Sequence, residues 1–467
     1  MPTMLDGCTP WPPEFADRYW SAGHWRGNTL ENLLRGWALQ YGPRTALVHG
    51  ATRLTYANLN RRVDRTAAGF RLRGVRPRQR VMVQLPNVPE FVVTVFALMR
   101  VGAIPVICPL SRRASEMAHV ARVSQAAGYV GPSTYEGFDH TAMAADIAAQ
   151  GAFLRRVFTL EAPGTASPYG GMTTDPSGCH YFPLGSVDAP PGPALDQSAD
   201  QVAFFLLSED TEVAEGTAEG AASPPELIAR THNDYAYQAR AAADAVSLTE
   251  DDVYLAALPA GSNLAFGCPG ILGTLCAGGT VVLPEDRSPA AGLAAVGRER
   301  VTVTSLTPAT ARLWLDALPA AGAGADMSSL RLVQLGGAPT DRETAEPVAT
   351  DGLGRRVQRV FAMAEGLLVL ARPDGPEETG PATRGRPLSP DDEIRVAGAD
   401  GKDVPDGEAG ELLARGPYTP RGYYRAPVLN ARCFTADGYF RTGHLARRLP
   451  DGDLLVTGRV DAAEASA

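Results

Sequence analysis

The spacing of apolar and polar residues between positions 27 and 130 alternates between a helical period and a strand period. Apolar positions three and four apart predict helices, and short runs rich in β-branched residues predict strands. The expected elements are a helix over 28–41, a hairpin from 45–48 and 53–56, a helix over 59–72, a strand over 80–84, a helix over 89–101 and a strand over 104–107. This alternation is typical of crossover units on a parallel sheet.

A second series of the same kind follows between positions 202 and 335. The expected strands are 202–207, 254–258, 280–283, 301–305 and 331–335, and the expected helices are 233–245 and 272–277. This series predicts a second α/β layer.

From about Gly385 the chain changes to short segments separated by turn signals such as Asp406-Gly407 and Asp437-Gly438. These signals predict a β-rich subdomain. Two stretches rich in Pro, Gly, Ser and Ala, 162–193 and 319–325, predict surface loops or linkers. We therefore expect an α/β protein in three parts. These are a first α/β lobe with an N-terminal extension (1–200), a second α/β lobe (201–384) and a β-rich subdomain (385–467).

Composition narrows the function classes. The chain has 467 residues, 45% of them hydrophobic, which is enough for large buried cores. A net charge of −9 argues against a nucleic-acid partner. The polar, proline-containing N-terminus and the absence of a long apolar run predict neither a targeting signal nor a membrane span. Six widely spaced cysteines support neither a zinc site nor a disulfide framework, so a reducing cytoplasm is expected.

Lysine is almost absent from the chain, and Lys402 is its only representative. Arginine can replace lysine at surface charges. It cannot replace a lysine that takes part in chemistry, because the guanidinium is larger and forked. Any mechanism that needs a lysine therefore has one candidate.

Motifs along nearly the whole chain resemble those of the adenylate-forming enzymes. The segments that carry the resemblance are Leu54-Thr55-Tyr56, Gln84-Leu85-Pro86-Asn87, Arg230-Thr231-His232, Gln334-Leu335-Gly336-Gly337-Ala338, Met363-Ala364-Glu365-Gly366, Arg421-Gly422-Tyr423-Tyr424 and Arg441-Thr442-Gly443. The chain is most similar to stand-alone ligases that load salicylate or 2,3-dihydroxybenzoate onto carrier proteins. The resemblance implies the N-terminal core of that fold, with an aryl-acid pocket in the second lobe.

The phosphate-binding loop of this family departs from its pattern here. The family has a Gly/Ser/Thr-rich loop ending in lysine, whereas Ser208, Glu209, Asp210 and Thr211 open an acidic segment that ends at Glu226. A carboxylate about 4 Å from a phosphate charge costs on the order of 4 kcal/mol at an effective dielectric of about 20. The segment is either an ordinary solvated acidic loop or a new metal site, and the solvated loop is the simpler interpretation. We expect no cofactor and no metal.

Other expected parts of the ATP site also differ. The resemblance places a ribose-binding aspartate at the position of His444, and a histidine at the position of Ser262. It also implies a mobile C-terminal domain carrying the catalytic lysine, which we expect to be absent. Glu365 stands where the family has a carboxylate near magnesium and the phosphates. Catalytic residues stay unknown, with Glu365, His444 and His232 as weak candidates.

The aryl-acid pocket is better preserved. The resemblance implies that Asn263 faces the carboxylate and ortho hydroxyl of the ring. The other expected substrate-binding residues are Leu264, Cys268, Gly336, Gly337, Ala338, Ala362 and Leu368. Cysteine at position 268 resembles a salicylate-type pocket, because a less polar wall leaves a second ring hydroxyl without a partner. Cys268 is equally well explained as a small buried apolar residue.

The sequence therefore favours an aryl-acid adenylating enzyme of siderophore or peptide natural-product assembly whose ATP chemistry has decayed. It would bind an aryl acid or its carrier-protein thioester, or catalyse an ATP-independent step. One alternative is a working ligase completed by a separate C-terminal domain. Another is a non-catalytic scaffold for an assembly-line partner. The expected partners are an aryl acid and a carrier protein, with no nucleic acid and no membrane.

Overall fold

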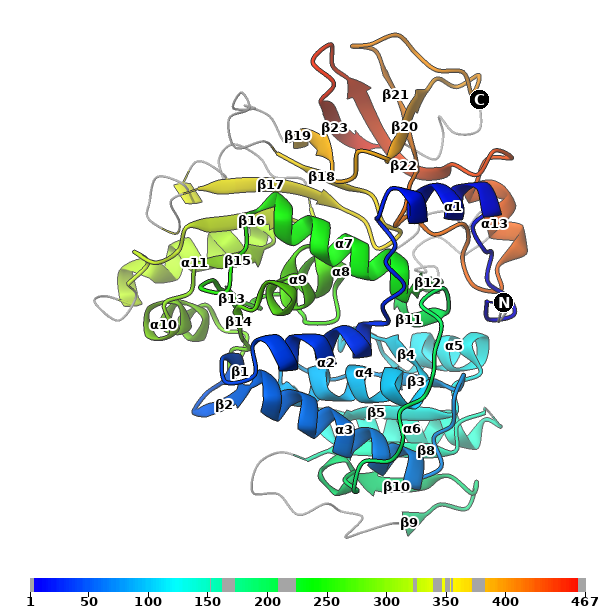
Figure 1. Cartoon of the computed structure of the whole chain (residues 1–467), viewed down its shortest axis with the longest axis vertical. Helices are drawn as coiled ribbons and strands as arrows, with labels where there is room; N and C mark the ends of the chain where they lie inside the picture. Colours follow the sequence, from blue (N-terminus) through cyan, green and yellow to red (C-terminus); the bar gives the residue numbers. More distant parts are fainter. Residues whose placement is uncertain are drawn as a thin grey trace.

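The computed structural model is built around two large β-sheets (Figure 1). The structure describes residues 4–151, 153–161, 173–208, 224–321, 326–338, 347–348, 353, 356–371 and 383–460. Within these residues the first sheet has eight strands, in the order β12 (Leu227–Thr231), β11 (Val202–Leu207), β4 (Ile104–Ile107), β3 (Arg80–Val83), β5 (Gly128–Pro132), β8 (Arg156–Leu160), β10 (His180–Pro183) and β9 (Thr173–Thr174).

The second sheet is longer and continues into the β-rich region at the top of Figure 1. Its described strands, in spatial order, are β2 (Thr52–Thr55), β1 (Thr45–His49), β14 (Thr280–Val282), β13 (Val253–Leu255), β15 (Val303–Leu306), β16 (Leu332–Gly336), β17 (Val357–Ala362), β18 (Leu368–Leu370), β19 (Thr383–Pro387), β23 (Leu454–Arg459), β22 (Phe440–Arg448), β21 (Ala409–Arg415) and β20 (Glu393–Ala397). A separate small hairpin pairs β6 (Thr134–Tyr135) with β7 (Phe138–Asp139).

Helices cover the faces of both sheets (Figure 1). They are α1 (Pro13–Ser21), α2 (Leu30–Gln40), α3 (Tyr56–Leu72), α4 (Pro89–Val101), α5 (Ala114–Ser124), α6 (His140–Ala149), α7 (His232–Ala245), α8 (Asn263–Gly267), α9 (Gly270–Ala277), α10 (Pro289–Glu299), α11 (Pro308–Ala321) and α13 (Pro427–Cys433). None of the helices in these described ranges combines the length and the apolar run needed to cross a bilayer.

The α/β architecture expected from the sequence is confirmed, and so are the elements of both series. The helix predicted over 89–101 is α4, and the strands predicted over 104–107 and 202–207 are β4 and β11. From position 385 the described chain consists mainly of antiparallel strands, as the turn signals indicate. All six cysteines are free thiols.

Two predicted sheet memberships are wrong. Strand β11 pairs in parallel with β4 of the first sheet, although the sequence assigned it to the second series. The β1–β2 hairpin pairs with β14 of the second sheet, although it belongs to the first series. Both exchanges cross the boundary expected at position 200. Strand pairing is decided by contacts distant in the chain, which a local pattern does not report.

The predicted loops are wrong in part. The stretch 162–193 contains β9 and β10, because β10 extends the first sheet by pairing in parallel with β8. Residues 162–172 of that stretch lie outside the described residues. Helix α11 includes Pro319 and continues to Ala321, so the second loop begins later than expected.

The core lies between the two sheets. Helix α4 is buried over almost its whole length and contacts β3 and β4 of the first sheet and β1 of the second. On the same interface Phe204 of β11, Tyr235 of α7 and Phe266 of α8 form a cluster of aromatic rings with centroids 4.6–5.7 Å apart. Burial of such rings stabilises the contact between the sheets and fixes where α7 and α8 meet.

Candidate functional site: a buried polar network beside an apolar wall

Asn263 occupies the first turn of the short helix α8. The helix begins there because the hydroxyl of Ser262 accepts a hydrogen bond from the backbone nitrogen of Ala265 over 3.3 Å. The Asn263 side chain is 9% exposed. Its Oδ1 accepts hydrogen bonds from the Tyr235 hydroxyl at 2.8 Å and from Gln238 Nε2 at 3.0 Å, and its Nδ2 donates to the carbonyl of Met363 at 2.7 Å. The carboxamide is therefore held from three sides.

Arg230, the residue before Thr231 at the end of β12, anchors this network. It is fully buried, and its Nε donates to Asp234 at 2.9 Å, which balances its charge. Its Nη2 donates to Gln238 Oε1 at 2.8 Å, and the guanidinium lies 4.6 Å from the centre of the Tyr235 ring. Asp234 also caps α7, where Thr231 accepts from its backbone nitrogen at 3.1 Å. The start of α7 and the network thus share one ion pair.

Arg230 also fixes the polarity of the network. A guanidinium can only donate, so Gln238 must turn its oxygen toward Arg230 and its nitrogen toward Asn263. Asn263 must then turn its oxygen toward Gln238 and its nitrogen toward the carbonyl of Met363. One hydrogen on Asn263 Nδ2 remains for another acceptor.

The apolar residues expected in the pocket lie next to this network. Leu264, Cys268 and Leu368 are buried in one hydrophobic cluster, and Ala362 packs against it. Ala362 pairs directly with Leu368 across β17 and β18. A Cβ added at Gly336 would lie 3.1 Å from Leu264 Cδ2, so the lack of a side chain lets β16 approach α8. The structure thus brings together six of the eight expected residues.

Gly337 and Ala338 continue from β16 on the exposed side of this group. Gly337 has φ of 78°, a left-handed conformation that glycine adopts without strain. Both residues are exposed. Residues 339–346, which follow them, lie outside the described residues.

Cys268 is in contact with the network as well as the apolar wall. Gln238 Nε2 lies 3.3 Å from its Sγ, and the side chain is 1% exposed. Burial raises the pKa of the Cys268 thiol to about 12, against the weaker opposing effects of Arg230 and Gln238. The thiol stays neutral, so it is suited to packing against a ligand and not to nucleophilic attack.

Glu365 and Glu226 lie on the side of Tyr423. The Tyr423 hydroxyl donates to Glu365 Oε1 at 2.8 Å, and Glu365 is 7% exposed. Burial raises the pKa of Tyr423, and the charges of Glu365 and Glu226 raise it further. Burial also raises the pKa of Glu226. One carboxylate, that of Glu365, therefore contacts this phenol, and the charge of Glu226 acts on it from a longer distance.

Ser208 and Glu226 close the base of the acidic segment. The Ser208 nitrogen donates to the Glu226 carbonyl at 2.9 Å, and the Glu226 nitrogen donates to Ser208 Oγ at 3.0 Å. Glu209, Asp210 and Thr211 lie outside the described residues. In the part of the chain that is described, no three His, Cys, Asp or Glu side chains gather into a metal-binding group.

The two candidate histidines lie in different places. His444 of β22 stands edge-on to Phe361 at 4.9 Å, and its Nδ1 lies 2.8 Å from the carbonyl of Thr442. Burial lowers the pKa of His444, against the opposing effect of Thr442. His232 lies at the start of α7 against α2, where its Nδ1 accepts from the backbone nitrogen of Leu30 at 3.1 Å. Burial lowers its pKa to about 3, so a structural role explains His232.

Tyr235, Gln238 and Tyr423 were not predicted from the sequence as site residues. Tyr235 and Gln238 are three positions apart on α7, which places them on one face of the helix. The spacing indicates that the two residues share a face of α7, but it does not indicate that this face points toward Asn263.

The comparison with known proteins decides the family. Residues 34–206 and 220–424 match the protein family described as "AMP-binding enzyme". The chain belongs to the AMP-binding enzyme family. Triostin synthetase I of Streptomyces triostinicus is 43% identical, over 98% of this chain and 80% of that protein. The 2,3-dihydroxybenzoate-AMP ligase of Bacillus subtilis is 41% identical, over 98% of this chain and 79% of that protein.

Two mycobacterial proteins extend the comparison to a solved structure. The salicyl-AMP ligase / salicyl-S-ArCP synthetase of Mycobacterium tuberculosis is 42% identical, over 98% of this chain and 77% of that protein. The apo structure of MbtA from Mycobacterium smegmatis matches with a TM-score of 0.85 and 40% identity, over 98% of this chain and 80% of that chain. Members of the AMP-binding enzyme family with aryl-acid substrates in their names are thus close relatives, and the fold is that of the N-terminal domain of adenylate-forming enzymes.

Proposed function

We propose that this chain binds a salicylate-like aryl acid beside Asn263, free or as a carrier-protein thioester, and does not form the aryl adenylate. The aryl-acid class rests on the names of the 2,3-dihydroxybenzoate-AMP and salicyl-AMP ligases, which are 41% and 42% identical to this chain. The carrier protein rests on the second name, which includes a salicyl-S-ArCP synthetase. The protein would act in siderophore or peptide natural-product assembly.

The buried network supports recognition of an aryl acid. Asn263 Oδ1 already accepts two hydrogen bonds, so the free capacity of this side chain is a donor on Nδ2. A donor suits the carboxylate or the ortho oxygen of salicylate. Leu264, Cys268 and Leu368 form a buried apolar cluster beside this donor, and apolar contacts supply most of the binding free energy of a ring.

The proposal that adenylation is lost rests on the charge of segment 208–226. It contains six carboxylates and no lysine or arginine, and the resemblance assigns it to the phosphate-binding loop of the family. Glu226 pairs with Ser208 at the base of this segment. Glu365 accepts a hydrogen bond from Tyr423, on which the charge of Glu226 also acts. Triphosphate in this region would meet like charge without a neutralising lysine. His444 further replaces the expected ribose-binding carboxylate with a ring whose Nδ1 is engaged by Thr442.

A working aryl-acid ligase is the second candidate, and Glu365 favours it. This carboxylate is retained at the position that the resemblance assigns to the magnesium and phosphate region. Its hydrogen bond from Tyr423 holds one carboxylate oxygen in place. The names of the two AMP ligases, which are 41% and 42% identical to this chain, also support this second candidate.

Calorimetric titration separates the two candidates. Salicylate should bind the wild-type chain, whereas ATP with magnesium should give no saturable heat. Asn263→Ala should weaken salicylate binding about tenfold, since it removes one polar contact. Asn60→Ala, which removes a partly buried hydrogen bond from Arg100 at 2.9 Å, is the control and should leave salicylate binding unchanged. Saturable ATP binding would favour the ligase, and absence of salicylate binding would contradict the proposed aryl-acid site.

A further inference from the structure

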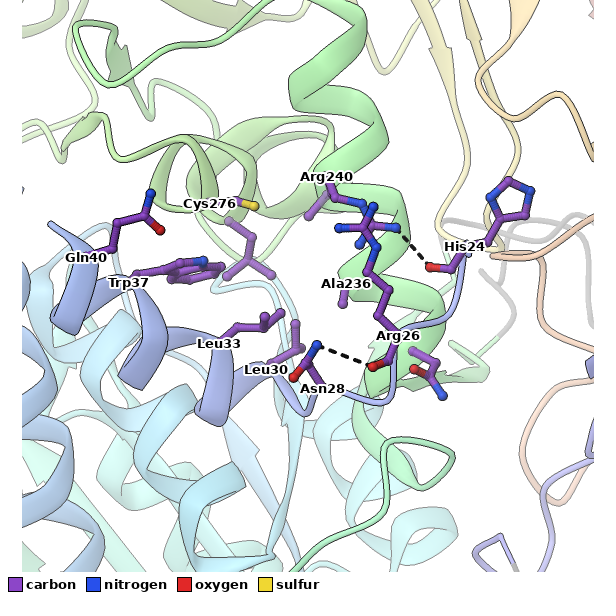
Figure 2. Close-up of a pocket in the computed structure, with 13 residues that line it drawn as sticks. His24, Arg26, Asn28, Leu30, Leu33, Trp37, Gln40, Ala236, Arg240 and Cys276 are labelled. Carbon is purple, nitrogen blue, oxygen red and sulfur yellow. Dashed lines mark hydrogen bonds between the residues drawn. The ribbon is translucent and has the colours of Figure 1, made fainter. Parts of the chain in front are cut away.

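A cavity lies on the far side of α7 from Asn263, between that helix, α2 and α9 (Figure 2). Its volume is about 250 Å³, slightly below the range of roughly 300–1,000 Å³ typical of drug-sized ligands. Its apolar lining comes from all three helices and includes Leu33, Trp37, Ala236, Ala239, Leu272 and Cys276. A cavity of this size suits a small molecule with an apolar body.

Two arginines stand together at one end of this cavity. Figure 2 shows the Arg26 side chain extending toward Arg240. Arg26 Nε donates to the carbonyl of Gly23 at 3.3 Å, and Arg240 Nη2 donates to the same oxygen at 3.5 Å. Arg240 Nη2 also donates to the carbonyl of His24 at 2.9 Å. Neutral carbonyl groups therefore hold two guanidinium groups within reach of one another.

The positive charge of this pair is not balanced within the cavity. No Asp or Glu is among the lining residues, and neither arginine forms an ion pair with a described residue. Asp244 lies one helical turn beyond Arg240 and acts on it only at longer range. Burial lowers the pKa of Arg240, and the charge of Arg26 lowers it further. An anion between the two guanidinium groups would relieve this repulsion, and two forked donors suit a planar carboxylate.

The geometry points to a binding site for a small apolar carboxylate in this cavity, with its head on Arg26 and Arg240 and its body against Trp37, Leu272 and Cys276. This site is distinct from the one beside Asn263. Asn233, Ala236 and Arg240 line it from one face of α7, whereas Tyr235 and Gln238 project from another face toward Asn263.

Calorimetry with octanoate as the probe tests the site. Octanoate should bind the wild-type chain at least about tenfold more tightly than octanol, which lacks the charge, or inorganic phosphate, which lacks the body. The double variant Arg26→Gln/Arg240→Gln should weaken octanoate binding at least about tenfold. Ala236→Leu should weaken it as much while keeping both charges, because the larger side chain fills the cavity.

Two controls make the outcome decisive. The double variant Arg61→Gln/Arg432→Gln removes two exposed charges elsewhere and should leave octanoate binding unchanged. Asn263→Ala should also leave it unchanged, which separates this site from the proposed aryl-acid site. Equal octanoate affinity in the wild type and in Ala236→Leu would overturn the inference, as would equal affinity for octanoate and octanol or the absence of octanoate binding.

Discussion

Gln238 Nε2 donates to Asn263 Oδ1 over 3.0 Å, and this bond agrees with the one from Asn263 Nδ2 to the Met363 carbonyl in fixing the orientation of the carboxamide. Both side chains are buried. Because Arg230 can only donate, the sequence of hydrogen bonds from Arg230 through Gln238 to Asn263 has a single polarity. Arg230 thus acts on Asn263 through Gln238, and the Met363 carbonyl holds the other end of the carboxamide.

Gln238→Leu should therefore weaken the proposed aryl-acid site as well as the fold. The change leaves donors of Arg230 and the oxygen of Asn263 without this partner, which we expect to lower the free energy of unfolding by about 1–3 kcal/mol. Salicylate affinity should fall about tenfold, because Asn263 loses one of the three hydrogen bonds that hold its carboxamide in place. Denaturant unfolding and calorimetry measure the two effects.

Gln84→Leu is the matched control for this variant. Gln84, which follows β3, is fully buried and bonded to Tyr129 of β5 and His140 of α6. It should lower the free energy of unfolding by a similar amount and leave salicylate affinity unchanged. An equal fall in affinity in both variants would show that stability, and not the orientation of Asn263, controls binding.

Cys268→Ser should shift ligand preference toward a ring with a second hydroxyl. The serine hydroxyl would lie where Sγ now contacts Gln238 and could bond the extra hydroxyl, a net gain of about 1 kcal/mol. Titration of salicylate and 2,3-dihydroxybenzoate into both forms measures the ratio of affinities. Cys179→Ser, at a buried thiol in the core of the first sheet, should leave the ratio unchanged. An unchanged ratio in Cys268→Ser would mean that position 268 does not contact the ligand.

His232 should make stability dependent on pH on the acid side. Its pKa is lowered to about 3 by burial, so the folded chain keeps it neutral while the unfolded chain protonates it near 6.5. Its contribution is fully present above pH 6.5 and is lost toward pH 3, by about 1.4 kcal/mol for each pH unit. His232→Asn keeps an acceptor for the Leu30 nitrogen without this titration.

The difference in unfolding free energy between wild type and His232→Asn should accordingly shrink as the pH falls from 6.5. Denaturant unfolding at several pH values measures it. A difference that stays constant over this interval would show that His232 titrates alike in both states.

Restoring the nucleotide contacts should restore ATP binding. A Gly/Ser/Thr-rich loop ending in lysine in place of 208–226, combined with His444→Asp, removes the repelling charges and supplies a carboxylate for the ribose. Calorimetry should detect ATP binding to this variant. Its turnover, measured as salicylate-dependent pyrophosphate exchange, should increase little. A folded variant that still does not bind ATP would mean that other residues exclude the nucleotide.

The helices and strands could be predicted because their apolar periods are local. Thr231 and Asp234 mark the start of α7 in the sequence itself, and the buried run of β11 is visible as six apolar residues. The membership of β11 in the first sheet could not be predicted, because it depends on pairing with β4 about 100 residues earlier.

The network around Asn263 was predictable only in part. Asn263 and Cys268 are found through motifs, but Gln238 is a polar residue on a helix, and the pattern alone places such a residue at the surface. Its burial is possible because Arg230, Asn263 and the Gly267 carbonyl satisfy its polar atoms. That compensation comes from two other elements, β12 and α8, and has no local signature.

Salicylate-dependent exchange of pyrophosphate into ATP tests the central claim most directly. We predict that the chain binds salicylate by calorimetry and, in the same preparation with magnesium present, exchanges no pyrophosphate above a blank without protein. Exchange above that blank which requires salicylate would contradict the claim, because it requires formation of the aryl adenylate.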